Sequence, residues 1–413
     1  MLKKEIKRNY PIDWKEYTFD TLFDFDGGLP VSRANLSNKG ICYLHYGDIH
    51  KLKENYIDVE RDADIIPKYD VPLENLSENY ILNDGDIAFA DASEDYEGIG
   101  KSVVVLNKGN IPFISGLHVI VARDKTDLLN REFKRFFLSN WNIRKQMKRI
   151  ATGISVLGIN RPNLRKIDAV LPPLKEQQKI ASILSTWDKA IELKEKLIEQ
   201  KKEQKKGLIQ NLLTGEVRLP GFDGDWMKKK IGDCIIESRE IATDPILEKR
   251  LTVRLNLKGI EQREVNPIEK VGATTQYVRK AGQFIYGKQN LHKGAFGLIP
   301  EKFDGYQTSS DIPSFNFKRG IDSKWFFYYM SREGFYRNLE RISTGTGSKR
   351  INPKDLYILN IKVPGINEQR EIANVLSTID KELELLNKEL NNIKHQKKGL
   401  MQLLLTGKVR VKA

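Results

Sequence analysis

The sequence predicts an α+β protein: two mixed α/β domains separated by two long antiparallel helices that form a coiled coil, with a pseudo-twofold internal repeat. Two observations predict this fold class. One segment of the chain recurs after 192 residues without a gap. Each copy carries apolar residues at the alternating spacing of three and four that is typical of a coiled coil. A length of 413 residues leaves room for a further domain before each copy.

The repeat is strongest from residue 176 to residue 218, where more than half of the positions are identical to those of 368–410. Weaker matches extend upstream, and Asp13-Trp14 near the start of the chain resembles Asp225-Trp226. The chain therefore alternates between a variable region and a repeated segment. A duplicated frame that carries two diverged regions suggests two versions of one task on two different targets.

Each repeated segment is predicted to be a helix of about 40 residues, roughly 60 Å long. Prolines at 172–173 and 364 precede the helices, and Gly215 and Gly407 are plausible ends. The middle of the first apolar seam is basic, so we expect weaker packing around Lys194, Lys201 and Lys205. The residues predicted to pack the two helices together are Ile180, Leu184, Trp187, Ile191, Leu208, Leu212, Ile372, Leu376, Ile379, Leu383, Leu386 and Leu390.

The variable regions read as mixed α/β. In the first, Asp84-Gly85 predicts a turn that leads into a strand, and further strands are expected from Val103 to Leu106 and from Phe113 to Val121. Amphipathic helices are expected around 131–149 and, in the second region, around 323–341.

Charge is the main compositional signal, because the formal net charge is +14. Ten basic residues and one acid lie between Arg131 and Lys166, which predicts a field of about nine positive charges that could follow a phosphate backbone. Apolar runs are too short for a membrane span, and two cysteines cannot build a disulfide framework. We therefore expect a cytoplasmic protein with an acidic partner and no membrane.

Patterns that would indicate catalysis are weak or missing. Gly100-Lys101-Ser102 resembles the end of a phosphate-binding P-loop, but Asp95 stands where its first glycine belongs. The five histidines have no metal-ligand spacing, although His45 and His50 lie near Cys42. The Asn-Pro-Pro-aromatic run of amino-methyltransferases is missing as well. We expect no catalytic, cofactor-binding or metal-binding residue in this chain.

The composition of one loop in the second half of the chain indicates a contact with phosphate more than it indicates an ordinary turn. Residues 344–350 combine small residues, which expose backbone amides, with hydroxyls and two cations. Its counterpart in the first half begins at Thr152 and ends at Arg161. The predicted DNA-binding residues are Lys101, Lys148, Arg149, Thr152, Asn160, Arg161, Lys288, Lys293, Thr346, Ser348, Lys349 and Arg350.

Two repeated helices, reading LPPLKEQQKIASILSTWDK and VPGINEQREIANVLSTIDK and each closing with a KKGL and LLTG run, resemble those of type I restriction–modification specificity subunits. The resemblance covers essentially the whole chain. It implies target-recognition domain 1 over 1–170, helix 1 over 171–215, target-recognition domain 2 over 216–360 and helix 2 over 361–413.

That resemblance also implies a function. Each recognition domain would read one half of a split site in double-stranded DNA, and the helices would set the spacer. Partners would be two methyltransferase (modification) subunits and the restriction (translocase) subunits of a bacterial or archaeal cell. S-adenosylmethionine, ATP and Mg would belong to those partners, so the chain itself would be no enzyme and hold no cofactor.

Three alternatives stay open at this point. The chain could serve a related restriction or phage-exclusion system, or be a stand-alone two-headed DNA-binding regulator. It could also be a fused methyltransferase or nuclease with an unrecognised site. Co-purification with a methyltransferase distinguishes the regulator from the specificity subunit, and a methyl-transfer assay distinguishes the enzyme.

Overall fold

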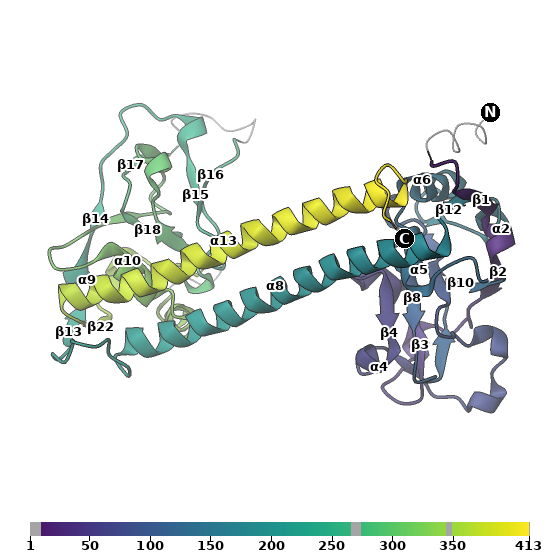
Figure 1. The fold of residues 1–413 in the computed structure, drawn as a ribbon. Helices are drawn as coiled ribbons and strands as arrows, with labels where there is room; N and C mark the ends of the chain where they lie inside the picture. Colours follow the sequence, from purple (N-terminus) through teal and green to yellow (C-terminus); the bar gives the residue numbers. More distant parts are fainter. Residues whose placement is uncertain (1–9, 266–273, 344–348, 413) are drawn as a thin grey trace. The chain divides into compact units, whose positions relative to one another are not determined.

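A computed structural model describes residues 10–265, 274–343 and 349–412 of the chain (Figure 1). The chain divides into two compact units. Unit 1 comprises Met1–Leu193 and Leu390–Ala413, and unit 2 comprises Lys194–Glu389. Two long helices run from one unit into the other, α8 (Leu174–Thr214) and α13 (Ile366–Leu405). Together with the mixed sheet and helix content of both units, these helices confirm the predicted fold class.

Unit 1 is built on a five-stranded sheet in the order β2-β10-β6-β8-β4 and a three-stranded sheet in the order β5-β3-β9. Its short helices are α2 (Phe19–Leu22), α3 (Tyr46–Lys51), α4 (Val59–Asp62), α5 (Arg131–Phe137), α6 (Trp141–Ile150) and α7 (Arg161–Leu164). Its strands are β1 (Lys15–Thr18), β2 (Phe23–Gly27), β3 (Ile41–Leu44), β4 (Tyr56–Asp58), β5 (Lys68–Tyr69), β6 (Ile87–Ala90), β7 (Ala92–Ser93), β8 (Ser102–Leu106), β9 (Phe113–Ser115), β10 (Val119–Asp124), β11 (Leu157–Gly158) and β12 (Asp168–Leu171).

Unit 2 repeats the centre of this arrangement with a four-stranded sheet in the order β14-β21-β18-β19. Its short helices are α9 (Ile231–Cys234), α10 (Ser323–Met330), α11 (Glu333–Asn338) and α12 (Pro353–Tyr357). Its strands are β13 (Met227–Lys230), β14 (Ile235–Ser238), β15 (Leu251–Val253), β16 (Ile260–Gln262), β17 (Tyr277–Arg279), β18 (Phe284–Tyr286), β19 (Phe296–Leu298), β20 (Tyr306–Thr308), β21 (Ser314–Phe317) and β22 (Asn360–Val363).

The two central sheets correspond strand by strand. The order β2-β10-β6-β8 in unit 1 matches β14-β21-β18-β19 in unit 2, with antiparallel pairing throughout both sets. In each unit a two-stranded sheet, β1-β12 or β13-β22, lies next in the chain to the start of a long helix. The internal repeat therefore includes the variable regions, where the sequence shows little identity.

Two expectations from the sequence were wrong in detail. The strand expected from Phe113 to Val121 is broken at residues 116–118, and its halves join different sheets as β9 and β10. Each of the amphipathic helices expected around 131–149 and 323–341 is two helices. Asn140 caps α6 by accepting a hydrogen bond from the backbone amide of Asn142, so the chain starts a new helix after α5.

The predicted helix-packing residues are buried or half-buried at every position. Towards the ends of the helices they join the cores of the units. Ile180 and Leu184 pack with the aromatic core of unit 1, and Leu212, Ile372 and Leu376 pack with that of unit 2. The helices are thus held by the domains as well as by each other.

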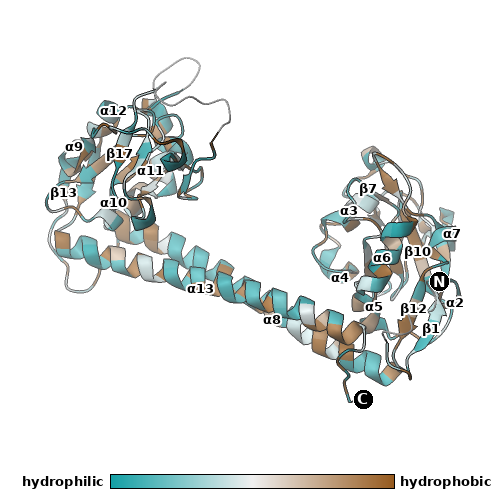
Figure 2. Cartoon of the chain, turned by 90° about the horizontal axis from the view of Figure 1, so that it is seen from above, coloured by the Kyte–Doolittle hydropathy of each residue, from teal (hydrophilic) through white to brown (hydrophobic). Residues whose placement is uncertain are grey.

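The basic middle seam of the first long helix meets acidic residues of the second. Within unit 2, the ammonium groups of Lys194, Lys201 and Lys205 pair with Glu389 (2.8 Å), Glu382 (3.0 Å) and Asp380 (2.5 Å) of the other helix. Higher numbers on α8 meet lower numbers on α13, so the helices are antiparallel. Figure 2 shows mostly hydrophilic residues in this stretch. The basic seam thus finds its partners on the second helix, and the weaker packing expected there stays a prediction.

A buried glutamate near the start of each long helix ties three parts of its unit together. In unit 1, Glu176 accepts a hydrogen bond from Trp14 Nε1 (3.1 Å) and two from the Arg410 guanidinium (2.7 and 2.9 Å). In unit 2, Glu368 takes the same bonds from Trp226 (3.1 Å) and Arg218 (2.6 and 2.8 Å). Both carboxylate side chains are only 3% exposed. Each of these clusters, called here a clamp, joins a domain to the start of one long helix and the residues that follow the other.

Replacing Glu176 with Ala should lower the free energy of unfolding of unit 1 by about 2–3 kcal/mol, because the tryptophan donor and the guanidinium lose a buried partner. The free energy of unfolding is measured by urea unfolding, with hydrogen exchange of the amides of unit 1 as the readout. Asp24→Asn is the matched control, because that carboxylate is 64% exposed in its ion pair with Lys125, and its effect should stay within about 0.5 kcal/mol. Equal effects of the two variants would contradict the clamp.

Candidate nucleic-acid interface

The field of about nine positive charges expected between Arg131 and Lys166 is partly neutralised. Five of the ten basic residues make ion pairs, four of them with acids that lie elsewhere in the sequence of unit 1. Lys134 is the extreme case, because its side chain is 3% exposed and also donates to the Gly85 carbonyl (2.8 Å). The pairs are Arg131–Asp84, Lys134–Asp124, Arg135–Glu132, Lys148–Glu97 and Arg165–Asp20. The fold therefore brings distant acids to part of the expected field and reduces its charge, while Lys145, Arg149, Arg161 and Lys166 stay exposed.

Lys101 is held inside unit 1. Its ammonium donates to the carbonyl oxygens of His50 and Leu52, each at 2.8 Å, and burial lowers its pKa. Lys148 pairs with Glu97 at 2.5 Å. These contacts give both lysines a role in joining loops, and they leave Arg149 and Arg161 as the exposed predicted cations of unit 1.

A short hairpin carries the exposed loop of unit 1. Thr152 and Gly158 exchange backbone hydrogen bonds (2.9 and 2.7 Å), and Gly153 turns the chain with φ +123°. A Cβ at Gly153 would lie 2.0 Å from the Val156 carbonyl oxygen, so only glycine fits there. At the tip, Ile154 is fully exposed. Asn160 follows the hairpin and caps α7 by accepting from the backbone of Asn163 (2.9 Å).

In unit 2 the predicted cation Lys293 lines a cavity of about 460 Å³ together with His292, Arg337 and Glu340. Lys349 reaches the same place, because its ammonium pairs with Glu340 at 2.9 Å. Burial is the main reason why the pKa of His292 is lowered, so the imidazole adds little charge. Thr346 and Ser348 lie outside the described residues.

Two predicted cations of unit 2 lie elsewhere. Arg350 donates to both carboxylate oxygens of Asp311, at 3.0 and 3.5 Å. Lys288 is half-buried, and its backbone amide donates to the Asp311 carbonyl oxygen (2.9 Å). The structure thus brings Lys293 together with Lys349, and Lys288 together with Arg350.

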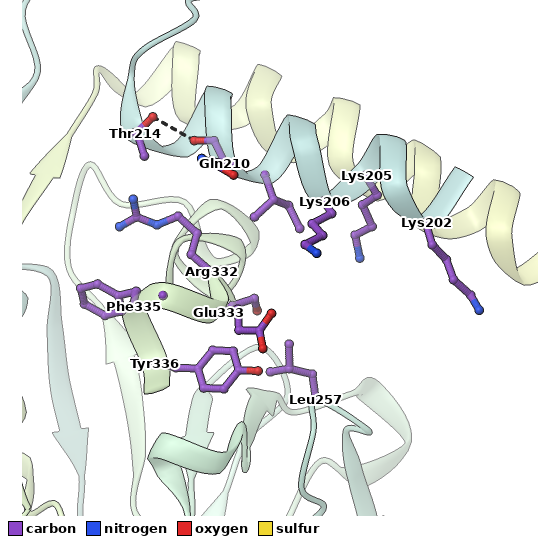
Figure 3. Close-up of a pocket in the computed structure, with 13 residues that line it drawn as sticks. Lys202, Lys205, Lys206, Gln210, Thr214, Leu257, Arg332, Glu333, Phe335 and Tyr336 are labelled. Carbon is purple, nitrogen blue, oxygen red and sulfur yellow. Dashed lines mark hydrogen bonds between the residues drawn. The ribbon is translucent and has the colours of Figure 1, made fainter. Parts of the chain in front are cut away.

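A cavity of about 690 Å³ lies between α8 and the start of α11 (Figure 3). Lys202, Lys205 and Lys206 extend from the helix, and Arg332, Glu333 and Tyr336 form the opposite wall. Lys202 and Lys205 are held by Glu199 and Asp380. No cluster of three possible metal-binding side chains occurs in the described part of the chain, nor is any described helix long and apolar enough to cross a membrane.

Two stretches, residues 11–202 and 224–395, match the family model for the type I restriction modification DNA specificity domain. The chain belongs to this family. The two matches cover most of the chain, one in each half. The chain is accordingly the DNA-recognition subunit of a type I restriction–modification system, a non-catalytic component.

Two relatives come from Methanocaldococcus jannaschii. The chain is 28% identical over 368 residues to the putative type I restriction enzyme MjaX specificity subunit, covering 83% of this chain and 82% of the relative. It is 27% identical over 287 residues to the MjaVIII specificity subunit, covering 64% and 68%. Both relatives are named as type I restriction enzyme specificity subunits.

Solved structures share the fold at low identity. The S subunit from M. genitalium is 13% identical with a TM-score of 0.54, covering 95% of this chain and 96% of that one. The HsdS subunit from Thermoanaerobacter tengcongensis is 16% identical with a TM-score of 0.51, covering 96% of each chain. A chain from a study of type I R-M complex assembly is 16% identical with a TM-score of 0.58, covering 97% and 99%.

Sequence reasoning missed the clamps, although all of their residues were repeated in the sequence. Trp14, Glu176 and Arg410 each have a counterpart in the second half, and that coincidence was the available signal. It also missed Asp91, which directly follows β6, and His118 and Asp311, which lie before β10 and β21. No repeated residue type marks those positions, so only the backbone reveals them.

Replacing Arg149 and Arg161 together with Gln should weaken DNA binding uniformly across sequences. If each guanidinium contacts one phosphate, the slope of log affinity against log salt should become shallower by about 2. The measurement is a salt titration of DNA binding by the complete complex.

Lys101→Met is the matched control for that titration. It should destabilise unit 1 by about 1–3 kcal/mol, because two carbonyl groups lose their donor, and it should leave the salt slope unchanged. A shallower slope for Lys101→Met, or an unchanged slope for the double variant, would contradict these assignments.

Proposed function

We propose that each unit reads one half of a two-part DNA site and that the two long helices set the spacer between the halves. The observation that carries the proposal is the pair of matching central sheets, which carry different exposed side chains and share one pair of helices. A protein that recognises one undivided DNA sequence needs no second domain with the same fold. Two matched domains with different surfaces suit two different half-sites.

We propose further that the chain binds two methyltransferase subunits through equivalent surfaces. Exposed leucines at corresponding positions of the helices support this, since Leu193 is 54% exposed and Leu385, 192 residues later, is 59% exposed. A surface that occurs twice can accept two copies of one partner. Restriction subunits would complete the complex, and S-adenosylmethionine, ATP and Mg would be held by the partners and not by this chain.

The spacer proposal is tested by lengthening both helices. Seven residues are added after Leu193 in α8 and seven after Glu389 in α13, which extends each helix by about 10 Å and preserves the heptad pattern. The methylated site should gain about three base pairs between its halves. Adding the heptad to α8 alone should abolish assembly, because the pairing of the helices loses its register. An unchanged spacer in the double insertion would contradict the proposal.

Partner binding is tested with a tagged methyltransferase subunit. The wild-type chain should be recovered with two methyltransferase copies, Leu193→Asp or Leu385→Asp with one, and the double variant with none, because a charge opposes burial of the surface. Leu197→Asp, at a leucine 38% exposed without an equivalent leucine in α13, is the control. A wild-type chain that recovers no methyltransferase and binds DNA alone would favour the stand-alone regulator.

A further inference from the structure

The same backbone junction is built in both units. In unit 1, Asp91 directly follows β6 and donates its amide to the His118 carbonyl oxygen (3.0 Å), while Ile159 donates to the Asp91 carbonyl oxygen (2.8 Å). In unit 2, Lys288 donates to Asp311 (2.9 Å) and Ile351 donates to Lys288 (2.9 Å). Ile159 and Ile351 are separated by the 192 residues that relate the long helices. Three chain segments therefore meet in one way at two equivalent places.

The side chains at these two places differ in kind. In unit 1, His118 Nδ1 lies 3.0 Å from Asp91 Oδ1, and the side chains are 49% and 28% exposed. In unit 2, Arg350 pairs with Asp311 at 3.0 Å, with exposures of 43% and 48%, beside Lys288. Two domains that recognise different DNA sequences require such a junction, in which the backbone is the same and the polar side chains differ.

His118 occupies a strained backbone conformation with φ +58°. Such a conformation is strained in a residue other than glycine and persists only where neighbouring contacts hold it. Here the Tyr43 hydroxyl anchors the segment, because it accepts from the Leu117 amide (2.7 Å) and donates to the Leu29 carbonyl oxygen (2.6 Å). The ring of Tyr46 lies edge-on to the imidazole, with 5.3 Å between centroids. Two tyrosines thus fix the direction of one half-exposed imidazole.

A buried arginine plays the anchoring part in unit 2. Arg279 is 1% exposed and donates to the Ile312 carbonyl oxygen (3.1 Å), to Ser314 Oγ (3.0 Å) and to Thr308 Oγ1 (2.6 Å). These bonds hold the segment on both sides of Asp311. In each unit, therefore, a buried polar side chain positions the segment that leads into a strand of the central sheet, β10 in unit 1 and β21 in unit 2.

The hydrogen bond between Asp91 and His118 decides which imidazole nitrogen is left for a base. Burial raises the pKa of Asp91 and the neighbouring His118 opposes that shift. A carboxylate only accepts hydrogen bonds, so His118 Nδ1 carries the proton that is shared with Asp91. Nε2 is then left for a base edge in the major groove: in the neutral ring it accepts from the exocyclic amino group of adenine or cytosine, and in the charged ring it donates to guanine.

We infer that Asp91–His118 in unit 1 and Lys288–Asp311 in unit 2 are equivalent base-reading positions, and that His118 contacts a base through Nε2. This inference rests on the proposed reading of one half-site by each unit. It separates base reading from the phosphate contacts assigned to Arg149 and Arg161, which lie on other segments of unit 1.

The experiment assembles the complex with its methyltransferase subunits and sequences the sites that it methylates. His118→Asn removes the imidazole with a residue that tolerates the same backbone conformation, and Asp91→Asn removes the carboxylate. Each should reduce discrimination about tenfold or more at one or two base pairs of one half-site and leave the other half unchanged. Lys288→Met and Asp311→Asn should do the same to the other half-site only.

Three results would overturn the inference. One is a His118→Asn complex that keeps the wild-type preference in both half-sites, and another is uniform loss of binding to all sequences with normal thermal stability. If unit 1 unfolds in His118→Asn, the unit 2 variants decide, and altered preference in both half-sites would contradict the assignment. A wild-type site that is not split would instead overturn the half-site proposal, and the inference with it.

Discussion

The clamps around Glu176 and Glu368 are the interaction on which the rest of the structure depends. Each buried carboxylate would be costly to desolvate alone, and each is compensated by a tryptophan N–H and a guanidinium. Because the donors come from the start of a domain and from the residues after a long helix, one carboxylate fixes three segments. The bonds to Glu176 and Asp13 raise the pKa of Arg410, so the guanidinium stays charged in its clamp.

The residue after each glutamate extends this constraint to the domain. Gln177 accepts from the Asn130 amide (2.8 Å) and donates to the Leu128 and Pro172 carbonyl oxygens (2.9 Å each). Gln369 makes the same bonds with Asp322 (2.8 Å), Gly320 (3.0 Å) and Pro364 (2.9 Å). Asn130 and Asp322 are the N-cap residues of α5 and α10, so each buried glutamine holds the start of the first helix after the central sheet. The domain surface is free to change because its attachment is not made by that surface.

This division of roles explains why the clamps and helix seams are alike in the two halves of the chain, whereas the surfaces of the two domains differ. Residues of the clamps and the helix seams contact other repeated residues, so a change in one requires a change in its partner. Residues at the ends of the central strands contact solvent or each other in local pairs. His118 with Asp91 and Arg350 with Asp311 are such pairs. Different recognition surfaces can thus be carried on one frame.

The sequence by itself determined the repeat, the two long helices, their apolar seams and the family, because these depend on identity and periodicity along the chain. Tertiary structure decided everything that depends on residues far apart in sequence. Lys205 reads as part of a basic seam until Asp380 is placed beside it, and Lys134 reads as an exposed cation until Asp124 and the Gly85 carbonyl enclose it. Likewise Phe113 to Val121 reads as one strand, and only packing around Tyr43 shows why the chain turns at His118. Charge and strand propensity are local properties, whereas neutralisation and strand breaks are decided by contacts that the fold creates.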